Sequence, residues 1–98
     1  MIATTRFTMA LSWTWDDNKA AANRLKHRVA FEAAVFALDD PSARYELDEH
    51  PDGDCWQTLD QVGPNVLLVI HTWPDQCVGR IISARLATLL ERRLYDGR

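Results

Sequence analysis

Residues 55–72 have the sequence CWQTLDQVGPNVLLVIHT, and this stretch decides the fold. Residues 55–62 are predicted to form one strand, and the apolar run at residues 66–73 has the length and composition of a second, buried strand. The Gly63-Pro64-Asn65 connection between them is tight, and strands joined by so short a connection pair in antiparallel fashion. We therefore expect an antiparallel hairpin here.

Further strands are predicted before and after this hairpin. Residues 77–84 form the last strand, after a turn at residues 73–75. Residues 43–47 are a weaker candidate, followed by a polar turn at residues 50–54. Because every connection is short, successive strands are expected to form an antiparallel meander.

Helices are predicted on both sides of this strand-rich region. A short alternating strand at residues 9–15 is followed by two acids that supply an N-cap and a favourable first-turn charge. Good helix formers then continue to residue 27, and a second short helix spans residues 31–38. Pro41 ends it, because the residue before a proline avoids the helical region.

The chain is predicted to close with a third helix. Residues 88–91 (TLLE) match a capping box, and the helix runs to about Tyr95. Leu86, Leu90 and Leu94 form its apolar stripe. The predicted fold class is α+β: a short N-terminal strand, two helices, an antiparallel meander and a C-terminal helix.

The size and composition indicate one domain. The 98 residues are expected to form a single domain, with residues 1–8 as a loose N-terminus. No apolar run reaches the roughly 18 residues that a membrane span needs, and the N-terminus does not resemble a signal peptide. Cys55 and Cys77 lack the spacing of a zinc site, and a single disulfide stays open. We expect a soluble, cytoplasmic protein with reduced thiols.

Charge is segregated along the chain, although the net charge is only −3. Residues 39–60 hold eight acids and one base, whereas the rest of the chain holds ten bases and six acids. The bases concentrate in residues 19–28, with four and no acid, and in residues 80–98, with five and two acids. Such segregation fits either a cationic binding face or ordinary solvated surface.

The first candidate site is NRLKH, residues 23–27. Asn23, Lys26 and His27 share one helical face, and Lys19 lies one turn earlier on it. A lysine beside a histidine can hold an anion while the imidazole transfers a proton near neutral pH. The alternative is a polar helix face on which His27 only complements the helix dipole at the C-terminus.

The second candidate is RIISAR, residues 80–85. Strict alternation along a strand predicts that Arg80 and Arg85 point to opposite faces of the sheet. A buried arginine must reach solvent, a carboxylate or a ligand, and its planar guanidinium binds phosphate in bidentate fashion. The alternative is a structural salt bridge to an acid of residues 39–60.

The third candidate is ERRLY, residues 91–95, in which Arg92 and Tyr95 lie one turn apart. Tyr95 can stack on a base or donate to a phosphate, or it can be a partly buried helix residue. His71, within an apolar strand, is interpreted as a core or edge histidine. His50, Asp52, Asp54 and Cys55 have no metal-ligand spacing, so no metal site is predicted.

In order along the chain, these segments resemble the BrnT family of toxins from bacterial type II toxin–antitoxin modules. The resemblance rests on the stretches WTWDDNKAAANRLKHRVAFEA, CWQTLDQVG, VLLVIHT, RIISARLAT and ERRLY, and covers residues 13–96. It implies a RelE-like fold and RNA cleavage that inhibits translation, with the RNA 2′-hydroxyl as nucleophile and neither metal nor cofactor. It also implies an antitoxin with a ribbon-helix-helix DNA-binding domain, in a heterotetramer that contacts DNA only through the antitoxin.

The resemblance also suggests roles for the candidate residues. Lys26, Arg80 and Arg85 would clamp phosphate, His27 would act as general base or acid, and Tyr95 would stack or donate a proton. Additional RNA contacts would come from these three residues: Lys19, Asn23 and Arg92.

Three residues depart from the family pattern. Arg28 stands where the family usually has a glycine, Cys55 stands where an arginine often precedes WQT, and Asp60 stands where a glycine is common in the following strand. A lost arginine and an added acid would both weaken phosphate binding. The alternative hypothesis is therefore an attenuated or non-catalytic member that still binds an antitoxin, and a third is a nucleic-acid-binding protein without cleavage.

Overall fold

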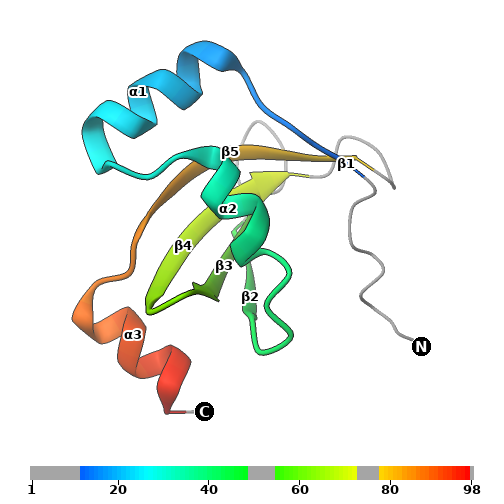
Figure 1. Ribbon diagram of the computed structural model, residues 1–98. Helices are drawn as coiled ribbons and strands as arrows, with labels where there is room; N and C mark the ends of the chain where they lie inside the picture. The colour runs from blue at the N-terminus through cyan, green and yellow to red at the C-terminus, as the bar shows by residue number, and fades with distance from the viewer. Residues whose placement is uncertain (1–11, 49–54, 73–77, 98) are drawn as a thin grey trace.

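The computed structural model describes residues 12–48, 55–72 and 78–97, which form an α+β fold (Figure 1). In chain order the elements are β1 (Ser12–Thr14), α1 (Asp17–His27), α2 (Phe31–Ala37), β2 (Arg44–Asp48), β3 (Cys55–Val62), β4 (Asn65–Thr72), β5 (Val78–Leu86) and α3 (Leu89–Asp96). The predicted order of elements is confirmed, and the bounds of β2 to β5 differ from prediction by at most two residues. The loose N-terminus and the turns predicted at residues 50–54 and 73–75 lie outside the described residues.

The five strands form one mixed sheet in the order β1-β5-β4-β3-β2. Strands β2 to β5 pair antiparallel with their neighbours in sequence, so the predicted meander is confirmed. Strand β1 instead pairs parallel with β5, a pairing that its sequence did not predict. Its Trp13 lies across Gly79 of β5: a Cβ added at Gly79 would come within 2.2 Å of the indole ring. A side chain at position 79 would therefore displace β1.

Helix α1 begins and ends as the sequence indicates. The Asp16 carboxylate accepts a hydrogen bond from the Lys19 backbone N–H at 2.9 Å, which makes Asp16 the N-cap. At the other end Arg28 adopts a left-handed conformation, with φ at 61° and ψ at 29°, and its N–H donates to the Arg24 carbonyl. A glycine would adopt this conformation without strain, so Arg28 carries a conformational cost here.

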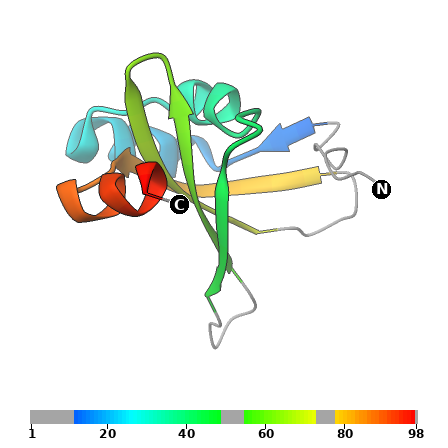
Figure 2. The same ribbon diagram turned by 90° about the horizontal axis from the view of Figure 1, so that it is seen from below.

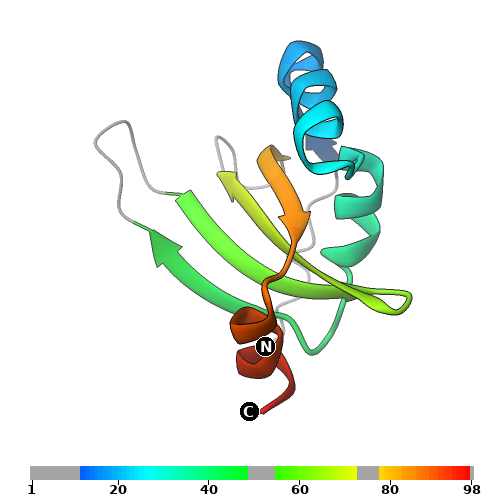
Figure 3. The same ribbon diagram turned by 90° about the vertical axis from the view of Figure 1, so that its left-hand side faces the viewer.

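The core lies between the sheet and α2. Helices α1 and α2 lie on the same side of the sheet, and α3 lies apart from them (Figure 3). Phe31, Ala34 and Ala37 of α2 pack on Val69 of β4 and Ile81 of β5, and all five side chains are buried. Burial of this apolar surface is the main source of stability.

Helix α3 is attached at the end of the sheet where β3 turns into β4 (Figures 1 and 2). Its capping box forms as predicted: the Thr88 hydroxyl accepts from the Glu91 N–H, and the Glu91 carboxylate accepts from the Thr88 N–H. The expected apolar stripe does not reach the core, because Leu86, Leu90 and Leu94 are 53%, 68% and 54% exposed. The buried residue of α3 is Tyr95.

None of the helices in the described parts of the chain is long and apolar enough to cross a membrane.

Candidate functional site on the open face of the sheet

A bulge in β5 decides which of its side chains share a face. Ile70 pairs with Ser83 and His71 pairs with Ile81, so β5 contains one extra residue between these pairs. Since paired residues project to the same face, Arg80, opposite Thr72, lies on the same face as Arg85, opposite Leu68. The prediction that the two arginines point to opposite faces is wrong, because strict alternation does not survive the bulge.

The face that carries both arginines is the one turned away from α1 and α2. We call it the open face. Within β3, β4 and β5 its members by strand register are Cys55, Gln57, Leu59 and Gln61 of β3, Val66, Leu68, Ile70 and Thr72 of β4, and Arg80, Ser83 and Arg85 of β5. Val66 and Leu68 are buried, whereas the part around the arginines is exposed or half-buried.

Of the two arginines of β5, Arg80 is the more accessible. Its side chain is exposed, and it makes no ion pair or hydrogen bond with the described residues. The expected alternative, a structural salt bridge to the acidic segment, is therefore absent at Arg80 within the described part of the chain. None of its five N–H groups is used by the described residues, so the guanidinium can donate to an external acceptor such as phosphate.

Arg85 is held in place by Glu91 of α3. Its Nη1 and Nη2 atoms each donate to one Glu91 carboxylate oxygen at 2.9 Å, and Nη1 also donates to the Leu86 carbonyl. Hydrogen bonding from Arg85 lowers the pKa of the Glu91 carboxyl, so the pair stays charged at neutral pH. The Nε–H and the second Nη2–H form no hydrogen bond with the described residues and can still donate side-on to a phosphate.

Helix α1 borders the outer edge of β5 beyond the short strand β1. The Asn23 amide donates to the Ala84 carbonyl at 2.8 Å and accepts from the Ala84 N–H at 3.2 Å, as a neighbouring strand would. It also donates to the Val29 carbonyl at 3.0 Å. Asn23 is 7% exposed and all these bonds are internal, so its amide is committed to the fold and not to an RNA contact.

The remaining candidates on α1 follow the helical face of Asn23 along the edge of β5. His27, one turn after Asn23, is half-buried, whereas Lys26 and Lys19 are exposed. No interaction of these three side chains with another described side chain is present. The two lysines and His27 therefore lie along the border of the sheet, where α1 passes the strand that carries Arg80 and Arg85.

Tyr95 and Arg92 attach α3 to the body of the protein. The Tyr95 hydroxyl donates to the Asp40 carboxylate at 2.5 Å, and the Tyr95 side chain is 5% exposed. Arg92 donates to the Pro64 carbonyl at 3.1 Å and lies 3.7 Å from the Asp96 carboxylate. These contacts agree with the alternative considered for Tyr95, a buried helix residue, and leave its ring no exposed surface for stacking.

The opposite face of the sheet buries two ionisable groups. Burial lowers the pKa of His71 to about 4, so its imidazole is neutral near neutral pH, as expected for a core histidine. Burial also raises the pKa of Asp60 to about 7; the hydrogen bond from Thr58 opposes this shift and the charge of Asp40 adds to it. Asp60 is fully buried and shares its face with α2, so it does not add a carboxylate to the open face.

No metal centre stands out in the part of the chain that the structure describes. No three His, Cys, Asp or Glu side chains among its residues lie close enough to hold a metal ion. The expectation that RNA cleavage by this protein needs no metal ion stays a prediction.

Comparison with known proteins supplies the family. A model described as the ribonuclease toxin BrnT of type II toxin–antitoxin systems matches residues 15–91. The chain belongs to the BrnT family. Among solved structures it is similar to the crystal structure of the Brucella abortus ribonuclease toxin BrnT, with 23% identity over 81% of this chain and 99% of that chain and a TM-score of 0.65. That likeness confirms the α+β fold, and no curated protein matches the chain.

The three departures from the BrnT pattern have different structural consequences. Arg28 occupies the left-handed helix end where glycine was expected, and Asp60 lies inside the core. Only Cys55 lies on the open face, by its register in β3 next to Trp56, which pairs with His71 on the helix side. Of the three departures, Cys55 is therefore the one that lies on the open face.

Two residues that hold the open face and α3 in place were not predicted from the sequence. Glu91 was interpreted only as part of a capping box, but it also fixes Arg85. Asp40 was interpreted as a helix-ending acid, but it receives both the Tyr95 hydroxyl and the Gln61 N–H. Neither contact has a local sequence signal, because each joins segments that only the folded chain brings together.

Proposed function

We propose that this chain is a metal-independent endoribonuclease that binds RNA across the open face of its sheet and, by cutting RNA, inhibits translation. The proposal depends chiefly on one observation: the β5 bulge brings the exposed Arg80 and the oriented Arg85 to the same face. Lys19, Lys26 and His27 lie on α1, which packs at the outer edge of β5, and we propose that RNA passes around this edge from the open face to reach them. Cationic groups so gathered attract a phosphate backbone.

The chemistry follows from the RNA itself. A base removes the proton of the 2′-hydroxyl, whose oxygen attacks the neighbouring phosphorus; we assign this base to His27. Arg80 and the free edge of Arg85 then stabilise the negative charge of the phosphorane. The bond from phosphorus to the 5′-oxygen breaks and that oxygen takes a proton, which His27 can return. The products are a 2′,3′-cyclic phosphate and a 5′-hydroxyl end.

Asn23 and Tyr95 are not among the proposed RNA contacts, because both side chains are engaged within the protein. The Asn23 amide bonds to the backbone of β5, and the Tyr95 hydroxyl bonds to Asp40. Tyr95 and Arg92 act by holding α3, which in turn carries Glu91 and orients Arg85. Their replacement should reduce cleavage only as far as it loosens α3.

The antitoxin of such a type II module is expected to cover the open face. We propose a BrnA-like partner with a ribbon-helix-helix domain, which dimerises and carries two copies of this chain in a heterotetramer. DNA would be contacted only through the partner. Buried arginines must remain paired, so the partner would place carboxylates beside Arg80 and along Lys26.

A second candidate is a non-catalytic module that retains only antitoxin binding. Cys55 on the open face and the engagement of Arg85 with Glu91 favour it, because each reduces the positive charge available to phosphate. A Cys55→Arg variant separates the two candidates. A harmless wild type that becomes growth-inhibitory with this substitution would identify a weakened toxin.

The direct test is expression of the chain alone in bacteria, together with incubation of the purified protein with RNA. We expect growth arrest and cleavage that persists in excess EDTA and leaves cyclic phosphate ends. RNA bound in a salt-sensitive manner but left intact would support a nucleic-acid-binding protein without cleavage. Normal growth with intact RNA at high expression would contradict the enzyme.

A further inference from the structure

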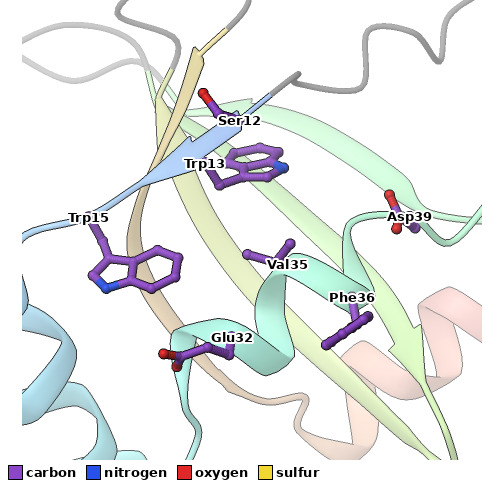
Figure 4. A pocket seen from close by; sticks show the side chains of 7 residues that line it. All are labelled: Ser12, Trp13, Trp15, Glu32, Val35, Phe36 and Asp39. Carbon is purple, nitrogen blue, oxygen red and sulfur yellow. The ribbon is translucent and has the colours of Figure 1, made fainter.

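A groove of about 470 Å³ lies between β1 and α2, on the opposite side of the sheet from the open face (Figure 4). Its lining consists of Ser12, Trp13, Trp15, Glu32, Val35, Phe36 and Asp39. Figure 4 shows Trp13 and Trp15 on one wall and Val35 and Phe36 on the facing helix. This volume is typical of sites that accept large apolar groups.

Two aromatic side chains of the groove are supported by contacts with the core. Trp13 makes an edge-on contact with His71 at 5.3 Å between ring centroids, and Trp15 makes one with Phe31 at 5.8 Å. Phe36 contributes no such core contact, since its side chain is 70% exposed. An aromatic side chain so exposed beside two half-buried tryptophans is typical of a surface that a partner covers.

The rim of the groove is acidic. Two of the seven lining residues, Glu32 and Asp39, are acids, and none is Lys, Arg or His. Glu32 and Asp39 are exposed at the groove and form no ion pair with the described residues. This negative rim repels RNA phosphate and attracts a basic partner, so the groove and the open face have opposite charge preferences.

We propose that this groove binds a segment of the antitoxin that inserts large apolar side chains between Trp13 and Phe36 and places Lys or Arg beside Glu32 and Asp39. The proposal rests on the proposed function for the existence of that partner. The antitoxin would then contact the chain at two surfaces. At the open face it would present carboxylates to arginines, and at the groove it would present Lys or Arg to Glu32 and Asp39. The groove would anchor the antitoxin. Because it lies on the other side of the sheet, substitutions in the groove leave the open face intact.

The test uses the full chain co-expressed and purified with the protein encoded beside it, and measures their dissociation constant by titration calorimetry. Phe36→Ala and Glu32→Lys are each expected to weaken binding about 10-fold or more, as for an aromatic anchor and a reversed charge. Two matched controls lie on α1: Leu25→Ala, at an exposed apolar side chain, and Asp17→Lys, at an exposed acid. Both are expected to bind as the wild type does.

RNA cleavage by each free variant is measured in the same preparations. Loss of binding by the groove variants with cleavage retained supports the proposal. Unchanged binding by Phe36→Ala and Glu32→Lys overturns it, whether or not the chain cuts RNA, whereas absence of cleavage by the wild type speaks against the proposed function instead. Binding that fails equally in the Leu25→Ala and Asp17→Lys controls would also overturn a specific role for the groove.

Two other occupants are distinguished by further arms of the experiment. If the chain's own residues 1–11 filled the groove, their deletion would tighten partner binding, and Phe36→Ala would then change the affinity of the full-length chain little. If a second copy of the chain filled it, light scattering would show a dimer that Glu32→Lys dissociates. Either result would replace the antitoxin as occupant.

Discussion

Replacement of Asp60 by asparagine should make the protein more stable at neutral and alkaline pH and leave it little changed in acid. The Asp60 carboxyl is fully buried, and its Oδ1 atom has no hydrogen-bond partner among the described residues. Its Oδ2 atom accepts from the Thr58 hydroxyl at 2.5 Å, and that hydroxyl also lies 3.4 Å from the Val69 carbonyl. A neutral acid at this site can donate to Thr58 while Thr58 donates to Val69, but an ionised one is poorly solvated.

The size of the effect follows from the shift in pKa, from 3.8 to about 7. A raised folded-state pKa means that the stabilising form is the protonated one. Its contribution is fully present below the unfolded pKa of about 4 and is lost as the pH rises to about 7. A shift of about three units at about 1.4 kcal/mol each corresponds to about 4 kcal/mol lost across this window. Asp60→Asn removes that loss.

Urea unfolding followed by tryptophan fluorescence between about pH 4 and pH 8 measures it. The free energy of unfolding of Asp60→Asn minus that of the wild type should rise by about 1.4 kcal/mol per pH unit within the window and then level off. Asp17→Asn, at an exposed helix position, controls for the loss of one acid. If the free energies of unfolding of the wild type and Asp60→Asn differ by the same amount at all pH values, the pKa of Asp60 is not raised by folding, because Asp60 would then titrate alike in the folded and unfolded states.

Three further substitutions test local features of the fold. Arg28→Gly should raise the free energy of unfolding by about 0.5–1 kcal/mol in urea titrations, because glycine removes the strain of φ at 61°. A lower free energy of unfolding would contradict the assigned end of α1. Gly79→Ala should lower the melting temperature and cost at least about 2 kcal/mol, because its Cβ would overlap the Trp13 ring; an unchanged melting curve would contradict the β1–β5 register. Tyr95→Phe should cost about 1–3 kcal/mol in urea titrations, because it leaves the Asp40 carboxylate without its hydroxyl donor; a cost near zero would show that α3 is held otherwise.

The sequence predicted the elements well because each has a local cause. The capping box at residues 88–91, the Asp16 cap and the Gly63-Pro64-Asn65 turn depend on neighbours within a few residues. The parallel pairing of β1 with β5 depends instead on Trp13 packing over Gly79, a contact between segments far apart in the chain. Periodicity within either strand does not encode it.

The sequence identified which residue types belong to the candidate site, but it did not predict how they are arranged in space. Arg80 and Arg85 were identified as phosphate ligands, but alternation assigned them to opposite faces because the bulge in β5, opposite Ile70 and His71, has no sequence signal. Asn23 was placed correctly on the helical face it shares with Lys26, yet that face turns toward the edge of β5. Helical spacing shows which side chains group together, and only packing shows what the group faces.

The most direct test of the account is RNA cleavage by the purified chain and two arginine variants, with the 3′ ends of the fragments analysed. We expect the wild type to produce 2′,3′-cyclic phosphate ends. Arg80→Ala should reduce the rate by roughly 100-fold, as expected when a transition-state charge loses a preorganised donor. Arg24→Ala, at an exposed α1 position outside the proposed site, should cut RNA at the wild-type rate. Cleavage by Arg80→Ala equal to that of the wild type would contradict the claim that the open face is the active surface.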